Sequence, residues 1–172
     1  MIWLWVLGGI VMVFAVTALT GAPYVPTRSR DAGKVFDELH PLTSSDVVVD
    51  IGSGDGVVLR AAARRGARAV GYEINPILAG ISKAVTRGNK GITIKWANYW
   101  RAQFPDDTTV VYTFGESRDI ERMAGKVRRE ATRIGRRLTF ISYAFEVPGE
   151  TLVVRNDMNF VYYIDPLQDA KA

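Results

Sequence analysis

The chain has 172 residues, of which 48% are apolar and 23% charged, and its formal net charge is +4. This length suits one domain of ordinary size, and the composition is that of a folded protein. The sequence has no cysteine and a single histidine, His40. These counts argue against serine–histidine or cysteine–histidine hydrolysis and against a metal site built on such residues, so no metal is expected.

The first 20 residues predict a membrane anchor. Residues 1–27 carry no charged side chain, and the apolar run at 1–20 would form a helix of roughly 30 Å, the thickness of a bilayer core. A cleaved signal peptide is the alternative, although its basic leading segment is missing. Because Arg28, Arg30 and Lys34 follow the run, we expect a single-pass membrane protein with its domain on the cytoplasmic side.

Two prolines in residues 21–28 predict a short extended tether. Downstream, apolar periodicity and turn signals predict helices over 29–40, 57–66, 75–88 and 118–134, and strands over 46–52, 68–74, 92–98, 108–115 and 137–145. Residues 151–165 predict an antiparallel hairpin around a polar turn. We therefore expect an α/β domain over 29–167, a Rossmann-like doubly wound sheet finished by this hairpin, with a short tail at 168–172.

The predicted helix over 118–134 has one apolar face and one basic face. The basic residues are Arg118, Arg122, Lys126, Arg128, Arg129 and Arg133. We interpret them as a solvated face, with a membrane or partner surface as the alternative.

Three glycines at alternate positions follow the first predicted strand, in "VVVDIGSGDGVVLRA" at 48–62. Such a turn brings backbone close to a ligand. A dinucleotide-binding turn would carry its third glycine at position 57, where this chain has Val57. Asp55 lies inside the turn, where it would repel a pyrophosphate and would suit a cationic amine.

Polar residues also mark the ends of the next two strands. Glu73 could accept hydrogen bonds from two ribose hydroxyls, a feature that nicotinamide and S-adenosylmethionine sites share. Asn98 could meet an adenine edge, because its amide both donates and accepts. The predicted cofactor-contacting residues are Asp50, Gly52, Ser53, Gly54, Asp55, Gly56, Glu73, Asn98 and Tyr99.

Together, Asp50, the glycine turn and Glu73 resemble the class I S-adenosylmethionine-dependent methyltransferases. The segments "APYVPT", "DIGSGDG" and "GYEINP", in that order, resemble the ATP synthase c-subunit lysine methyltransferases and their prokaryotic relatives. The resemblance implies S-adenosylmethionine as cofactor and a protein lysine as acceptor, in some members on a small membrane protein. Two positions depart from the family: Val57 replaces a usual arginine, and Asn98 a usual acidic residue.

Methyl transfer to lysine requires alignment and a deprotonated amine. An apolar, aromatic slot would lower the lysine pKa by desolvation. The candidate substrate-binding residues are Tyr24, Pro26, Thr27, Trp100 and Phe114, with ordinary packing as the alternative for the aromatic ones. Glu116 and Tyr24 are the catalytic candidates. Glu116 could steer the lysine or accept its proton through water, or could simply favour a helix N-terminus.

These features predict a membrane-anchored protein-lysine N-methyltransferase. The alternatives are a methyltransferase for a small molecule or lipid, a non-catalytic S-adenosylmethionine-binding protein and, last, a nicotinamide-dependent oxidoreductase. The fourth strand ends in "TFGE", without the Asn/Asp-Pro-Pro-aromatic motif of enzymes that methylate base amines. We therefore expect a protein partner and no nucleic acid.

Overall fold

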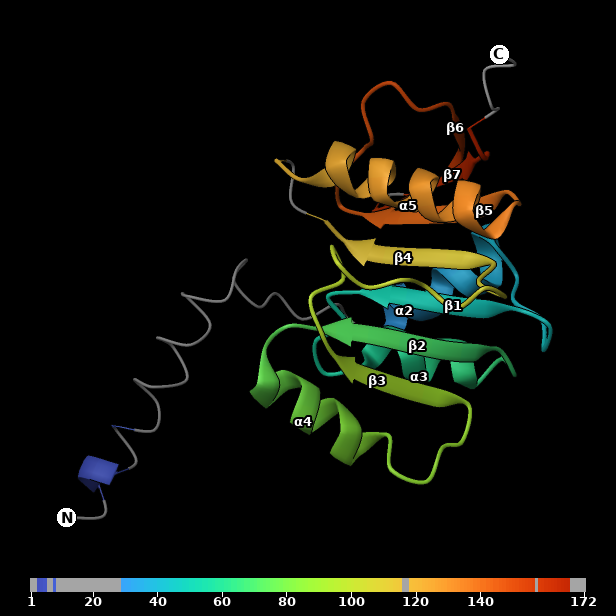
Figure 1. Ribbon diagram of the computed structural model, residues 1–172. Coiled ribbons are helices and arrows are strands. Elements are labelled where there is room, and N and C mark those ends of the chain that lie inside the picture. The colour runs from blue at the N-terminus through green and yellow to red at the C-terminus, as the bar shows by residue number, and fades with distance from the viewer. Residues whose placement is uncertain (1–2, 6–7, 9–28, 116–117, 157, 168–172) are drawn as a thin grey trace.

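A seven-stranded sheet forms the centre of the protein, with strand order β3-β2-β1-β4-β5-β7-β6. The computed structural model describes residues 3–5, 8, 29–115, 118–156 and 158–167. The strands are β1 Val47–Ile51, β2 Arg68–Glu73, β3 Ile92–Trp96, β4 Val110–Phe114, β5 Leu138–Tyr143, β6 Leu152–Arg155 and β7 Asn159–Ile164 (Figure 1).

Strands β1 to β5 run parallel, while β7 pairs antiparallel with β5 and β6 pairs antiparallel with β7. The predicted Rossmann-like sheet and its terminal antiparallel hairpin are therefore confirmed. Strands β2 and β3 lie on one side of β1, and β4 and β5 lie on the other. The strand order therefore reverses between β1 and β4. Ligands of open α/β sheets bind at the point where the strand order reverses, next to the carboxyl ends of the strands.

The helices also begin and end close to their predicted positions. They are α2 Ser29–Lys34, continued by the π-helix η1 Val35–Leu39, then α3 Val57–Ala63, α4 Pro76–Val85 and α5 Ile120–Ile134. The predicted cap of α4 is confirmed: the Asn75 side chain accepts hydrogen bonds from the amides of Ile77 at 2.9 Å and Leu78 at 3.3 Å.

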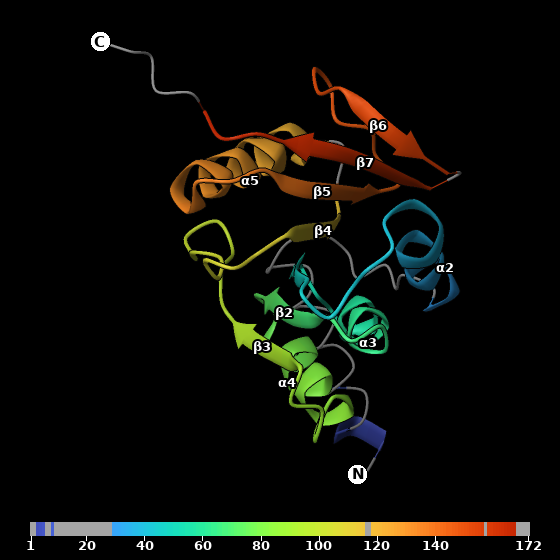
Figure 2. The ribbon, with the colours of Figure 1, turned by 90° about the vertical axis from the view of Figure 1, so that its right-hand side faces the viewer.

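Helices cover both faces of the sheet, so its central strands are buried on both sides. Figure 2 shows α5 on one face and α2 and α3 on the other. All five residues of β1 are buried, which explains its run of valines. On the α2 and α3 side, Phe36 packs against Tyr112, with ring centroids 6.2 Å apart. On the α5 side, Val127 and Ala131 belong to the same buried cluster as Phe140.

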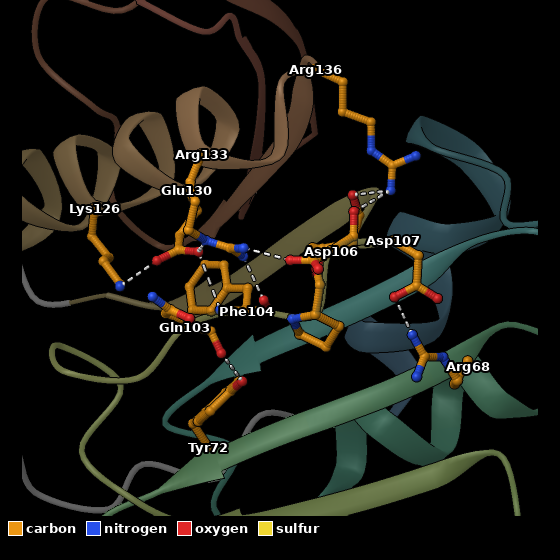
Figure 3. A network of polar contacts seen from close by, with 12 residues as sticks. Arg68, Tyr72, Gln103, Phe104, Asp106, Asp107, Lys126, Glu130, Arg133 and Arg136 are labelled. Carbon is orange, nitrogen blue, oxygen red and sulfur yellow. Dashed lines mark hydrogen bonds and ion pairs between the residues drawn. The ribbon is translucent and has the colours of Figure 1, made fainter.

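The connection between β3 and β4, residues 97–109, contains no helix and is anchored on α5 by buried charges (Figure 3). The Glu130 carboxylate accepts hydrogen bonds from Lys126 Nζ at 2.6 Å, Arg133 Nε at 2.8 Å and the Phe104 amide at 3.2 Å. Lys126 also donates to the Ala102 carbonyl, and Arg133 pairs with Asp106. The prediction that Lys126 lies on a solvated face is wrong, because only 6% of this residue is exposed.

The predicted membrane anchor needs correction. Apart from residues 3–5 and 8, residues 1–20 lie outside the described part of the chain, as does the tether at 21–28. Among the described residues, no helix combines the length and the apolar character that crossing a membrane requires. This finding contradicts the prediction of a single-pass membrane protein, anchored through residues 1–20 and facing the cytoplasm.

Replacing Glu130 by glutamine should destabilise the fold. Burial raises the pKa of Glu130, but hydrogen bonds from Lys126, Arg133 and the Phe104 amide outweigh burial and hold the pKa below its usual value. Glu130→Gln leaves Lys126 buried without its counter-ion, a change that typically costs ~3–5 kcal/mol. Urea unfolding at neutral pH measures the difference in the free energy of unfolding.

The same variant predicts a pH dependence. A depressed carboxyl pKa stabilises the folded state above the ordinary glutamate pKa, and this stabilisation is lost as the pH falls through the folded-state value. The free energies of unfolding of the wild type and Glu130→Gln should therefore become equal in acid. Glu121→Gln, an exposed position on the same helix, is the control and should change stability by about 0.5 kcal/mol or less. An equal loss in both variants would contradict the role of Glu130.

Candidate active site

The glycine turn lies between β1 and α3, at the carboxyl edge of the sheet. Gly52, Gly54 and Gly56 have φ angles of +73°, +52° and +78°, a region that glycine adopts without strain. A Cβ at Gly56 would also lie 2.4 Å from the Ser82 hydroxyl oxygen. A Cβ at Gly52 would have no atom within 4 Å, so the space in front of this residue is open. A ligand can therefore approach the backbone of the turn from the Gly52 side.

Glu73, the last residue of β2, holds this turn in place. One carboxylate oxygen accepts a hydrogen bond from the Gly54 amide, and the other accepts one from the Asn75 amide, both at 2.8 Å. A carboxylate has about four lone-pair positions, so two remain for hydroxyl groups of a ligand. Glu73 is 6% exposed, and the predicted ribose contact fits this geometry.

Two further carboxylates flank the turn. Asp50 is 3% exposed; burial raises its pKa well above the usual value, and repulsion from Glu73 and Asp55 adds to the effect. Asp55 accepts a hydrogen bond from the Val57 amide at 3.3 Å, and its carboxylate lies 3.6 Å from the Arg60 guanidinium. An acidic site of this kind favours a cationic ligand over a pyrophosphate.

Arg60 is a site residue that the sequence reasoning missed. Its guanidinium donates to the Asp55 carbonyl at 2.6 Å as well as facing the Asp55 carboxylate, so it fixes the middle of the turn. The signal in the sequence was its position one helical turn after the last glycine. Ser53, by contrast, was predicted and lies in the turn, 5% exposed, with its amide donating to the Tyr72 carbonyl at 3.1 Å.

Asn98 and Tyr99 follow β3 at the same edge. The Ala97 amide donates to the Glu73 carbonyl at 3.0 Å, which places Asn98 beside the end of β2. Its side-chain oxygen accepts a hydrogen bond from the Trp100 amide at 3.0 Å. An adenine contact would therefore have to rely mainly on the side-chain nitrogen of Asn98.

The predicted substrate-binding aromatic residues lie in different layers. Trp100 packs in the α5 cluster, with its ring 4.6 Å from that of Tyr99 and 4.1 Å from the Arg122 guanidinium carbon. Phe114 packs on the α2 and α3 side, 5.1 Å from the ring of Tyr143. The remaining candidates, Tyr24, Pro26, Thr27 and Glu116, lie outside the described residues.

The sequence of this chain is similar to known methyltransferases. Residues 50–153 match the family model of the ANTKMT methyltransferase domain. A protein-lysine N-methyltransferase from Saccharolobus islandicus is 30% identical over 154 residues, which cover 83% of this chain and 91% of the relative. The ATP synthase c-subunit lysine N-methyltransferase of Rattus norvegicus is 35% identical over 134 residues, covering 72% of this chain and 61% of the relative.

The corresponding human protein is 35% identical over 111 residues, which cover 63% of this chain and 46% of the human protein. The chain thus spans less than two thirds of the length of these mammalian relatives. Among solved structures, an RNA methyltransferase from Salinibacter ruber in complex with S-adenosyl-L-homocysteine superposes with a TM-score of 0.69. It is 22% identical, and the match covers 86% of this chain and 98% of that one, which supports the fold alone.

Asp50→Asn should stabilise the ligand-free protein at neutral pH. Because folding raises the pKa of Asp50, the folded state binds this proton more tightly than the unfolded state does. Its contribution therefore becomes less favourable as the pH rises from the ordinary aspartate pKa through the raised value. Asparagine removes this penalty, and each kcal/mol released raises the melting temperature by about 2–4 °C for a chain of this size.

Calorimetry across pH checks this expectation. The melting temperatures of wild type and Asp50→Asn should converge as the pH falls to the ordinary aspartate pKa, while Glu38→Gln, at an exposed position on η1, should follow the wild type throughout. A lower melting temperature for Asp50→Asn than for wild type at neutral pH would show that the buried charge is compensated.

Proposed function

Because the chain belongs to the ANTKMT methyltransferase domain family, we propose that it transfers a methyl group from S-adenosylmethionine to a lysine side chain of a protein. The observation that carries the cofactor assignment is the Glu73 carboxylate, held against the open glycine turn by two backbone amides. The lysine assignment rests on the relatives, which are named as lysine N-methyltransferases.

The acidic turn fits the cofactor. Glu73 would accept hydrogen bonds from the ribose hydroxyls, Asp50 or Asp55 would face the amino group, and Asn98 would meet the adenine. When bound, S-adenosylmethionine supplies a methyl group on a sulfonium, whose sulfur leaves as a neutral thioether. The positive charge of the cofactor also relieves the repulsion among the three carboxylates.

The protein's own part in such a reaction is alignment and exclusion of water, with no covalent nucleophile. The carboxyl ends of β1 and β4 are neighbours in the sheet, with Ile51 opposite Thr113 in register. We propose that the cofactor lies over β1 and β2 and the acceptor over β4 and β5. Glu116, two residues after the end of β4, is proposed to steer the lysine or take its proton through water.

Methyl transfer can be tested directly. Purified protein is incubated with methyl-labelled S-adenosylmethionine and, separately, with the isolated c-subunit of ATP synthase, with other lysine-rich proteins and with RNA. Mass spectrometry then locates the label, which we expect on a lysine Nε atom. Label on a nucleotide or on a small molecule, or binding of the cofactor without any transfer, would overturn the proposal.

Glu73→Ala should weaken binding of S-adenosylmethionine about 10–100-fold, because hydrogen bonds to a charged acceptor are each worth about 1.5–3 kcal/mol. Isothermal titration calorimetry measures the affinity, and the melting temperature shows that the variant is folded. Glu38→Ala, at an exposed site, is the matched control and should bind like the wild type. Unchanged affinity in Glu73→Ala would remove Glu73 from the cofactor site.

A further inference from the structure

Three residues stand in one row across the carboxyl edge of the sheet. Phe114 ends β4 and is paired in register with Tyr143, which ends β5; Tyr143 is paired in turn with Asn159, which begins β7. Residues paired in this way place their side chains on the same face of a sheet. That face is the α2 and α3 side, where Tyr143 is 8% exposed and the two aromatic rings lie 5.1 Å apart.

The side chain of Asn159 has a fixed orientation. Its amide nitrogen donates to the Asn156 side-chain oxygen at 3.1 Å. The same Asn156 oxygen accepts hydrogen bonds from the backbone amides of Met158 at 3.2 Å and Asn159 at 2.9 Å. An atom that accepts from two amides must be the oxygen of Asn156, so the Asn159 atom facing it must be nitrogen.

The other polar atom of this amide, the Asn159 side-chain oxygen, therefore points away from the turn. Asn159 is 2% exposed, and its oxygen has no hydrogen-bond partner in the part of the chain that the structure describes. Buried acceptors in native proteins are normally paired. A buried acceptor without a partner, paired in register with Tyr143 at the carboxyl edge of the sheet, indicates a donor that arrives with a ligand.

The backbone next to this row is strained, which is common at functional sites. Ala144 directly follows Tyr143 and has a φ angle of +68°, a conformation that side chains other than glycine rarely adopt. It is held there because its amide donates to the Met158 carbonyl at 2.7 Å, and the Ser142 hydroxyl donates to the Phe145 carbonyl at 2.6 Å. The first bond ties the end of β5 to the turn that precedes Asn159, and the second fixes the segment that follows β5.

We propose that Phe114, Tyr143 and Asn159 form the slot for the acceptor lysine, an inference that rests on the proposed function. Lysine suits such a slot, because its stem is apolar and its one polar atom lies at the far end. Phe114 and Tyr143 contact the stem and exclude water, which lowers the pKa of the lysine ammonium by desolvation. The Asn159 oxygen accepts a hydrogen bond from the lysine amine and so orients its lone pair.

A neutral acceptor is the appropriate group at this position. The amine arrives after losing one proton to solvent; its lone pair forms the new N–C bond, the S–C bond breaks, and the electron pair of that bond stays on sulfur. The methylated ammonium then releases a proton to solvent. A carboxylate in place of Asn159 would favour the protonated lysine and oppose the first step, whereas the aromatic faces tolerate the cation that forms in the second.

Two substitutions of Asn159 test the slot, using a peptide that carries the lysine methylated by the wild-type protein. Asn159→Leu keeps the volume and removes both the unpaired acceptor and the donor to Asn156. We expect kcat/KM for the peptide to fall about tenfold or more. Binding of the peptide to the cofactor-free protein, followed by fluorescence anisotropy, should weaken about threefold or more. The affinity for S-adenosylmethionine should stay within about twofold of the wild type, because Asn159 on β7 is separated from β1 and its glycine turn by β4 and β5.

Asn159→Asp keeps the size and adds a charge, and it decides the question if the leucine variant does not fold. We expect the pH at which kcat/KM reaches half its maximum to rise by about one unit, because the carboxylate stabilises the lysine ammonium. A merely structural role would lower activity without moving this profile. Asn89→Leu, at an exposed turn before β3 on the opposite edge of the sheet, is the matched control and should behave like the wild type.

The outcomes separate the two proposals. If the wild-type protein methylates no lysine, the proposed function fails and the slot fails with it. If it methylates lysine while Asn159→Leu keeps wild-type kcat/KM and peptide affinity, or Asn159→Asp keeps the wild-type pH profile, the proposed function stands and the slot is overturned.

Discussion

The two hydrogen bonds of the Glu73 carboxylate join the two loops that build the candidate site. The Gly54 amide belongs to the turn between β1 and α3, and the Asn75 amide belongs to the turn between β2 and α4. One side chain thus fixes two neighbouring loops against each other at the carboxyl edge of the sheet. The left-handed glycine conformations are retained because this acceptor, Arg60 and the Tyr72 carbonyl hold the turn from three sides.

The carboxylates that suit the site to a cationic ligand also destabilise the ligand-free protein. Asp50 is buried beside Glu73 and Asp55, so the ligand-free site contains repulsion that the rest of the fold must offset. The fold does so with the fully buried central strand β1 and with the charge network around Glu130, in which the buried Lys126 and Glu130 are paired with each other. A cationic ligand would reduce this repulsion and so stabilise the folded protein.

Local signals made most of the fold predictable from sequence. The alternate glycines, the Asn75 cap before Pro76 and the polar turn at 155–159 each act within a few residues. The Glu130 network was not predictable in this way, because Glu130 and Phe104 are 26 positions apart and neither carries a local signature of the contact. Asn159 was missed for a related reason: in sequence it is an ordinary hairpin residue, and only its pairing with Tyr143 brings it to the site. The membrane helix was predicted from hydropathy, and no helix among the described residues has the length and apolar character to cross a membrane.

The position of β7 has a consequence for synthesis on the ribosome. This strand inserts between β5 and β6, so β5 keeps an open edge until residue 164 has emerged. Residues 50–75 include the glycine turn and Glu73 of the proposed cofactor site, and they are translated long before β7. The part of the domain proposed to bind the cofactor therefore emerges first, and the part proposed to bind the acceptor closes last. In the interval the unpaired edge of β5 is exposed to aggregation.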